Sequence, residues 1–512
     1  MQLKRRFVQA PASVPYLLPP SVDDWVPENH LARHIKEVVA KLDLSEFYLC
    51  YEELEGRGRP PFDPAMMLRT LIYCYATGRF SSRKIETATY DDIAVRFLTE
   101  ELHPDHDSFA DFRKRHLSRF ASVFVQVVHL SVEMGFTKLG HLALDGTKLK
   151  GAASKRNTFT VEKLAEALSK ERALVRELLA KAAEVDAKDE ADDKLVPAEL
   201  AKHEERLARL ERAKALYDEQ MRALTGPAEA QQAEAADASA TPPEACPGPA
   251  RLKKARLARG LTQRQLAEVT GLTRNRIDAL ERDRCIPSED EIRRLSEVLG
   301  VDASALLFRA KVKKPKPPKP TPPAGPKHVN IVDPDSNIMV TREGAARIQG
   351  YNPQIVVDQH AGIIVAGFVS NCTTDTVSHG PAVGLVVNNL GRLPPIWSAD
   401  SVYFSAVNVT DPRLEGVEVL VPPKRDPKHC KQPNSIVTAM REKLADPSKR
   451  EIYNMRSAIV EPAFSRIKCA QGFTRFRLRG LAGVTGEWHL VTTAQNLMRM
   501  FAMMNRNAAL AN

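Results

Sequence analysis

The sequence predicts a multi-domain protein of mixed α and α/β class, and three observations lead to this prediction. The chain has 512 residues, several times the roughly 150 residues of an ordinary domain. Apolar residues recur at helical spacing between residue 28 and about residue 135, whereas short apolar runs typical of strands follow residue 327. Two proline-rich segments separate a further module from its neighbours.

The composition predicts a globular protein that stays in the cytoplasm. The chain is 43% hydrophobic and 27% charged, and no apolar run is long enough to cross a bilayer. Prolines interrupt the short apolar stretch near the start, so no secretory signal is visible. The seven cysteines are scattered without a CxxC pair, which argues against a disulfide framework and a zinc site. A net charge of +10 favours a polyanionic partner, because lysine and arginine displace counterions from nucleic-acid phosphates.

Residues 1–136 are expected to form a helical domain. Asp63, followed by a proline, is typical of a helix start, and the apolar segment after it stops at Gly78. Another helix is expected to start near Asp107 and to continue to the end of the domain. Its basic face begins at Arg113, and two interpretations stay open for that face: a solvated surface or a contact with phosphate.

The rest of the chain is expected to be an α/β domain with two insertions. Residues 137–160 contain its first strand, an apolar run that ends at Asp145. Residues 161–225 have heptad-like spacing and a polar break, which predicts an antiparallel helical hairpin. The remaining segments are a linker at 226–250, a compact module at 251–308, a Pro/Lys-rich linker at 309–327 and the remainder of the α/β domain at 328–512.

The module between the linkers is predicted to consist of short helices. Thr262 and Ser288 each begin a capping box, and Gly271 supplies a tight turn between two helices. The predicted core consists of Leu257, Leu266, Ala267, Leu272, Ile277, Leu280, Ile292, Leu295 and Leu299. This stretch resembles the helix-turn-helix domains of phage repressor and Cro-type regulators. The resemblance implies that DNA is contacted by Gln263, Gln265, Thr273, Arg274, Asn275 and Arg276.

Two aspartates follow apolar strands of the predicted α/β domain. Asp145 ends the run LAL, and Asp400 ends the run IWSA. Enzymes that cut and rejoin DNA need two divalent ions about 4 Å apart, and Mg²⁺ prefers carboxylate and water ligands. If the two strands lie side by side, these acids meet. Asp358, which follows the run IVV, is the rival carboxylate for a metal position.

Five segments occur in the order and with the texture of DDE transposases of bacterial insertion sequences: LALDGTKLKGAASK, DPDSNIMVTREG, QGYNPQIVVDQHAGIIVAGFVSN, SADSVY and YNMRSAIVEPAFSRIKCAQGFTRFRLRGL. The resemblance covers nearly all of the chain outside residues 226–327. It implies a ribonuclease-H-like mixed-sheet catalytic domain behind a helical N-terminal domain. It also implies that Asp145, Asp400 and Glu461 are the catalytic acids and hold two Mg²⁺ or Mn²⁺ ions.

The third acid has local support. Tyr453, Arg456, Glu461 and Lys468 resemble the family's Tyr-Arg-Glu-Lys signature, and the first, second and fourth of these are expected to contact DNA. In an α-helix Glu461 and Lys468 are seven residues apart and share one face, which would present a metal ligand and a cation for phosphate. The next segment carries Arg475 and Arg477, for which DNA contact and a solvated basic loop stay open.

The family resemblance implies an enzyme that cleaves and joins DNA strands at the ends of an insertion sequence. Its expected partners are double-stranded DNA, as terminal inverted repeats and target, and a second copy of the chain in a homodimer on DNA. Such a protein would be cytoplasmic and nucleoid-associated, without a membrane partner. One alternative is a catalytically inactive, DNA-binding transcriptional regulator, and another is a metal-dependent nuclease that does not join strands.

Overall fold

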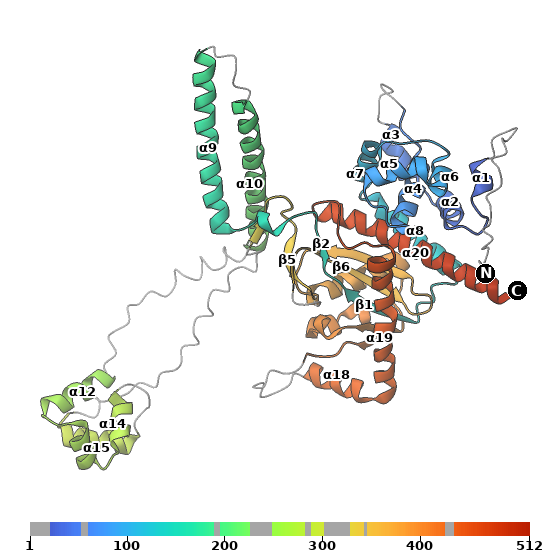
Figure 1. The fold of residues 1–512 in the computed structure, drawn as a ribbon. Helices are drawn as coiled ribbons and strands as arrows, with labels where there is room; N and C mark the ends of the chain where they lie inside the picture. Colours follow the sequence, from blue (N-terminus) through green and yellow to red (C-terminus); the bar gives the residue numbers. More distant parts are fainter. Residues whose placement is uncertain are drawn as a thin grey trace, which may run out of the picture. The chain divides into compact units, whose positions relative to one another are not determined.

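The computed structural model describes residues 21–52, 60–188, 195–225, 248–281, 288–301, 328–341, 346–424 and 435–511 (Figure 1). The described residues up to Tyr217 and after Pro326 form one compact unit, and those from Asp218 to Gly325 form a second. No helix in these described ranges is long and apolar enough to cross a membrane.

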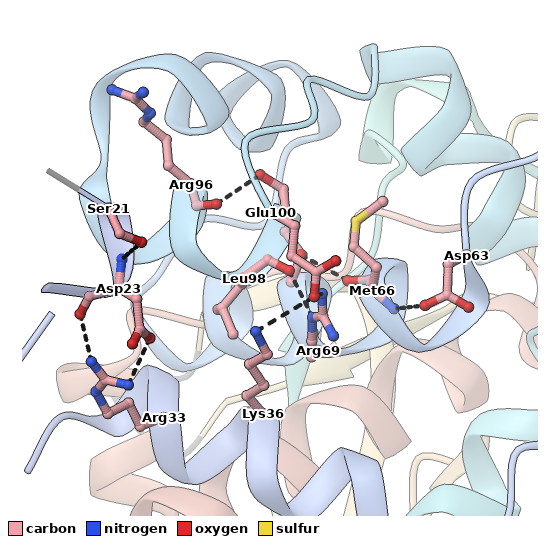
Figure 2. Close-up of polar contacts among 12 residues, drawn as sticks. Ser21, Asp23, Arg33, Lys36, Asp63, Met66, Arg69, Arg96, Leu98 and Glu100 are labelled. Carbon is pink, nitrogen blue, oxygen red and sulfur yellow. Dashed lines mark hydrogen bonds and ion pairs between the residues drawn. The ribbon is translucent and has the colours of Figure 1, made fainter. Parts of the chain in front are cut away.

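The N-terminal part of the first unit is helical, as predicted. Its helices are α1 (Val22–Trp25), α2 (Leu31–Lys41), α3 (Ser45–Glu52), α4 (Pro64–Ala76), α5 (Ser82–Asp91), α6 (Ile93–Thr99), α7 (His106–Arg115) and α8 (Arg119–Glu133). The Asp63 side chain accepts a hydrogen bond from the Met66 amide and caps α4, as Figure 2 shows. Arg69 of α4 donates to the Leu98 carbonyl at 2.6 Å and pairs with Glu100 at the end of α6, which ties these two helices together.

The single helix expected from Asp107 to the end of the domain is wrong, because a turn divides this segment into α7 and α8. Asp105 caps α7, and the helix ends before His116. The His116 ring is buried and stacks on Phe47 of α3 with 4.7 Å between ring centroids, a tertiary contact that helical periodicity does not reveal. Arg113 is also buried, where it donates to the Phe80 carbonyl, so it is not part of an exposed basic face.

A mixed sheet forms the centre of the first unit. Its strands are β1 (His141–Gly146), β2 (Leu149–Lys150), β5 (Asn337–Val340), β6 (Arg347–Asp358), β7 (Ile364–Ser370), β8 (Ile396–Ala399) and β9 (Glu418–Leu420). They run in the order β2-β6-β1-β8-β9, and β5 and β7 also pair with β6. Strand β1 is antiparallel to β6 and parallel to β8. A mixed sheet is consistent with the expected ribonuclease-H-like catalytic domain.

Long helices cover this sheet and connect it to the N-terminal helices. They are α16 (His379–Leu390), α18 (Ser435–Ala445), α19 (Pro447–Ser465) and α20 (Leu481–Ala511). Helix α20 packs against α4, α8 and β7, whereas α19 packs against β1, β6 and β8 (Figure 1). One continuous core therefore runs from the N-terminal helices to the sheet, and Trp488 of α20 is completely buried in it.

The chain leaves and re-enters the sheet domain at neighbouring points. Strand β3 (Thr158–Thr160) precedes the inserted residues, β4 (His328–Asn330) follows them, and Thr160 pairs with His328 in antiparallel register. Between them come α9 (Val161–Lys188) and α10 (Leu195–Thr225), which pack through an apolar seam and an Arg172–Glu211 ion pair. Because its two ends are adjacent, the insertion leaves the pairing between β1 and β6 intact.

The second unit contains α12 (Gly248–Ala258), α13 (Gln263–Thr270), α14 (Arg274–Glu281) and α15 (Glu289–Leu299). Both predicted capping boxes are present, and Gly271 ends α13 in the left-handed conformation at φ 67°. One member of the predicted core is wrong: Leu257 is 58% exposed, and Leu252 is buried instead. The other predicted core residues are buried or pack against the core.

Candidate active site and DNA-binding module

Asp145 and Asp400 lie at adjacent strand ends. Strands β1 and β8 are parallel, and Leu144 pairs with Ala399, so each aspartate comes one residue after a paired position. The carboxyl ends of neighbouring parallel strands meet at one edge of a sheet, and successive residues along them stay in step. The Asp145 side chain is largely buried, whereas Asp400 is half-buried and also begins the short turn Ser401–Tyr403.

A buried arginine lies against this pair. Arg456 of α19 approaches Asp145 with 3.3 Å between its Nη1 and Oδ2 of the carboxylate, and both side chains are about nine-tenths buried. Burial works to lower the pKa of Arg456, but the negative charges of Asp145 and Asp400 outweigh burial and raise it. Burial also raises the pKa of Tyr453. The positive charge of Arg456 works to lower this pKa, and the negative charge of Asp400 works to raise it. The structure thus brings together four residues that the sequence analysis selected.

Glu461 lies further along α19 and is exposed. At about 100° per residue, a position five residues after Arg456 is turned by roughly 140° around the helix axis. The α-helix ends at Ser465, and a π-helical turn, η6 (Arg466–Ala470), follows, so Glu461 and Lys468 are not in one regular α-helix. The wider turn changes the angle of Lys468 around the helix axis, and the shared face stays a prediction.

Within the described residues, no three His, Cys, Asp or Glu side chains are grouped closely enough to hold a metal ion. The donor chemistry nevertheless fits Mg²⁺, since Asp145 and Asp400 supply carboxylates at one sheet edge. The guanidinium of Arg456 offsets one of their two negative charges through its ion pair with Asp145. A divalent ion at this edge would replace or supplement that cation.

The rival carboxylate is at the other end of β1. Asp358 pairs with Leu142, whereas Asp145 pairs with Ile355, so the two acids are separated by three residue positions along the strand. The Asp358 side chain is fully buried and accepts hydrogen bonds from the amides of Leu139 and His360. This carboxylate holds the loop that leads into β1 and is not a neighbour of the Asp145–Asp400 pair.

A polar network beside the aspartates was missed by the sequence analysis. Gln354 of β6 pairs with Gly146, and a Cβ added at Gly146 would lie 2.2 Å from the Gln354 Nε2. The Gln354 amide group donates to Asn352 Oδ1 at 2.8 Å and to Asp375 at 3.1 Å. Tyr403, in the turn after Asp400, donates to Gln354 Oε1. A side chain at Gly146 would therefore displace the Gln354 amide group from this network.

The same network is anchored by an ion pair. Lys148 Nζ lies 2.8 Å from Asp375 Oδ1, and both side chains are about 15% exposed. Burial and the charges of Asp375, Asp145 and Asp400 raise the pKa of Tyr403 well above its ordinary value, so its hydroxyl remains a donor. The detectable signal was two polar residues, at alternate positions, next to the apolar run IVV, because a buried strand rarely carries amides without partners.

The segment that carries Arg475 and Arg477 is held on the edge of the sheet. The Phe476 amide donates to the Lys150 carbonyl at 2.9 Å, and Arg475 and Lys150 form a parallel bridge. The Phe476 ring is fully buried, whereas both arginines are exposed. The carboxylate of Glu487 accepts from the amide of Arg477 at 2.8 Å, which fixes the backbone between these side chains.

The module's predicted DNA-contacting residues divide into two groups. Internal bonds occupy three of them: Gln263 donates to Glu281, Gln265 completes the capping box with Thr262, and Arg276 makes two bonds of 2.9 Å with Glu291. The other three are exposed at the start of α14: Arg274, Asn275 and Thr273, whose hydroxyl also accepts an internal hydrogen bond from the Arg276 amide at 3.2 Å. Glu281 also pairs with the buried Arg256, which joins α12 to α14.

Three family models match separate segments of the chain. A transposase domain (DUF772) matches residues 20–115, a helix-turn-helix model matches residues 252–306, and a transposase DDE domain matches residues 424–501. The last match contains Glu461, and the two aspartates lie outside it. No curated protein and no solved structure matches the chain in the same comparisons. The three matches, together with the sheet and its strand-end acids, support a DDE transposase that carries a helix-turn-helix module.

Proposed function

We propose that this chain cleaves DNA at the ends of an insertion sequence and joins the ends to a target by metal-dependent phosphoryl transfer. The observation that carries the proposal is the placement of Asp145 and Asp400 at adjacent ends of parallel strands, beside the buried Arg456. Acids held on a rigid sheet edge suit phosphoryl transfer, in which the protein mainly positions charge.

In the proposed mechanism Asp145, Asp400 and Glu461 hold the two ions. Bound Mg²⁺ or Mn²⁺ would activate the attacking oxygen and stabilise the leaving oxygen. Glu461 is exposed on α19, and Pro462, which follows it, lacks the amide for a helical hydrogen bond. We propose that the missing hydrogen bond lets the helix adjust here, so that Glu461 can turn toward the aspartates. Arg456, which lies beside Asp145, would supply a cation for a phosphate of the DNA.

The proposal is tested by cleavage of a labelled duplex that carries the element's end. We expect the full-length protein to cut the duplex with Mg²⁺ and to lose this activity when EDTA removes the metal. Transfer of the cut 3′ end into a second duplex would distinguish a transposase from a nuclease. Binding without cleavage under any metal condition would contradict the proposal and favour the regulator.

The helix-turn-helix module is proposed to read a DNA sequence through its exposed residues. Thr273, Arg274 and Asn275 occupy the N-terminal end of the recognition helix, where side chains reach base edges in the major groove. The two bonds between Arg276 and Glu291 instead join α14 to α15. Arg276 is therefore assigned to the internal structure of the module.

Arg274→Ala is expected to weaken binding to a preferred duplex by about 1–3 kcal/mol and to reduce discrimination against random sequence. The preferred duplex would be selected from a random pool with the wild-type protein, and both affinities would be measured by fluorescence anisotropy. Arg293→Ala is the matched control, because Arg293 is exposed on α15 and pairs only with Asp290 within the described residues. An equal loss in both variants would contradict a base-reading role for Arg274.

A further inference from the structure

A wide groove on the sheet domain is lined by cations. Its volume is about 1020 Å³, and its described lining contains six basic and no acidic residues. The six are Lys150, Lys155, Arg156, Arg347, Arg475 and Arg477, and all are exposed. They come from three places: β2 with the turn after it, the start of β6, and the segment before α20. We refer to this feature as the basic groove.

The charges of the basic groove are not balanced within the described part of the chain, where none of the six side chains is in an ion pair. Lys150 and Arg475 are direct neighbours in a parallel bridge. Like charges held opposite each other in a sheet repel, and the repulsion falls when an anion binds between them. The arrangement therefore favours a bound polyanion.

Hydrogen bonds hold the backbone beside several of these cations. The Gly151 amide donates to the Gln349 carbonyl, and the Phe476 amide donates to the Lys150 carbonyl, both at 2.9 Å. The amides of Arg477 and Leu478 both donate to the buried Glu487. The charged side chains thus extend from fixed positions, which is the arrangement that a repeating row of phosphates can use.

The lining also indicates which form of nucleic acid fits. Single strands are generally bound by stacking their bases on exposed aromatic side chains. Phe476 is the aromatic residue in the described lining, but it is fully buried and packs edge-on against Tyr351. The basic groove therefore offers charge without a stacking surface, as expected for the sugar-phosphate backbone of a duplex.

We infer that the basic groove holds the backbone of the duplex whose phosphodiester lies at Asp145 and Asp400. The distance along β6 from the basic groove to the partner of Asp145 gives the expected distance between this contact and the reacting phosphodiester. Residues Gly350 and Arg347 precede Ile355, the partner of Asp145, by five and eight positions. At about 3.3 Å per residue this is at most roughly 17–27 Å, or about five to eight base pairs from the reacting phosphodiester. The position relative to the reaction rests on the proposed function, whereas the duplex binding does not.

The inference is tested by DNA binding in EDTA with the full chain, in a background of Arg274→Ala that weakens the module's own contacts. The probe is a labelled 30-base-pair duplex of arbitrary sequence, titrated at several salt concentrations. Lys155→Gln with Arg475→Gln removes two exposed charges from the basic groove. Arg392→Gln with Lys202→Gln removes two exposed charges elsewhere and is the matched control.

The groove variant is expected to bind tenfold to a hundredfold more weakly near 0.1 M salt, and its log–log salt slope should be smaller by about 2. The control should retain the wild-type slope. Equal slopes in all three proteins, or an equal decrease in both variants, would overturn the inference. A single strand that loses as much affinity as the duplex would overturn the assignment to duplex. The assay contains no metal, so a failure of the cleavage proposal would not affect the binding result. Conversely, if the groove variant keeps the wild-type salt slope, the inference fails even when the wild type cleaves DNA.

Discussion

Asp400→Asn is expected to reduce metal-dependent cleavage by about three orders of magnitude, which corresponds to the several kcal/mol that a metal site contributes to the transition state. Asparagine has the shape of aspartate but lacks its negative charge, so the strand end should keep its structure while its affinity for Mg²⁺ falls. Asp145→Asn and Glu461→Gln are expected to have the same effect. Initial rates on the end duplex would measure the change, and anisotropy would verify that DNA binding is retained.

The matched control for the third acid is Glu451→Gln. Glu451 is exposed on α19, as Glu461 is, and it lies ten residues earlier in the same helix. The two substitutions alter the helix charge equally, so only a role at the reacting phosphodiester should separate them. Wild-type cleavage by Glu461→Gln would remove this residue from the proposed metal site. Loss of cleavage in both variants would indicate a general effect on the helix.

The sequence was sufficient where local chemistry decides the structure. Asp63, Thr262 and Ser288 cap helices as predicted, because each supplies a side-chain acceptor to the free amide three residues later. The apolar runs before Asp145 and Asp400 became neighbouring strands, as the shared chemistry of the two acids suggested.

The sequence was insufficient where distant segments decide the structure. His116 interrupts a helical pattern because its ring packs on Phe47, about seventy residues away. Leu257 fits the helical period of the module's core, yet the core is completed by Leu252 from the preceding turn. Asp358 could be separated from Asp145 only through the register of β1 and β6, which the apolar pattern leaves open.

The orientation of Glu461 needs a further explanation. Family spacing selected this residue, but an ideal α-helix turns it away from Arg456, and the π-helical turn after Ser465 changes the phase of Lys468. The first effect follows from the regular helix that contains both residues, whereas the second arises from the π-helical turn that begins at Arg466. A helical wheel assumes a uniform 3.6-residue period, so it applies up to Ser465 and not to the π-helical turn that carries Lys468.

Glu487→Ala is expected to lower the free energy of unfolding of the sheet unit by about 3–5 kcal/mol, because it leaves buried polar groups without a partner. Glu487 is completely buried in α20, and its carboxylate accepts from the Tyr75 hydroxyl at 3.1 Å and from the amides of Arg477 and Leu478. Tyr75 in turn accepts from Arg113 of α7. Urea unfolding followed by the fluorescence of the buried tryptophans would measure the loss.

Glu487→Gln separates loss of the hydrogen bonds from loss of the charge. Burial raises the pKa of Glu487, although the amides of Leu478 and Arg477 and the charge of Arg113 work to lower it. A carboxyl group with a raised folded pKa favours folding at pH values below its unfolded pKa, and this contribution is lost as the pH rises through the folded pKa. Glutamine keeps an oxygen acceptor without a titrating charge. The Gln variant should therefore unfold within about 1 kcal/mol of the wild type at neutral pH and show less dependence on pH.

The two substitutions at Glu487 also connect stability with DNA binding. The amides that donate hydrogen bonds to Glu487 belong to the segment that carries Arg475 and Arg477 in the basic groove. Glu487→Ala should thus weaken duplex binding even at temperatures where the protein is folded, whereas Glu487→Gln should bind like the wild type. If the Ala variant loses stability but keeps the wild-type salt slope, then the fixed backbone is not needed for the cations to reach the phosphates. The N-terminal helices would then stabilise the sheet domain without organising its DNA-binding surface.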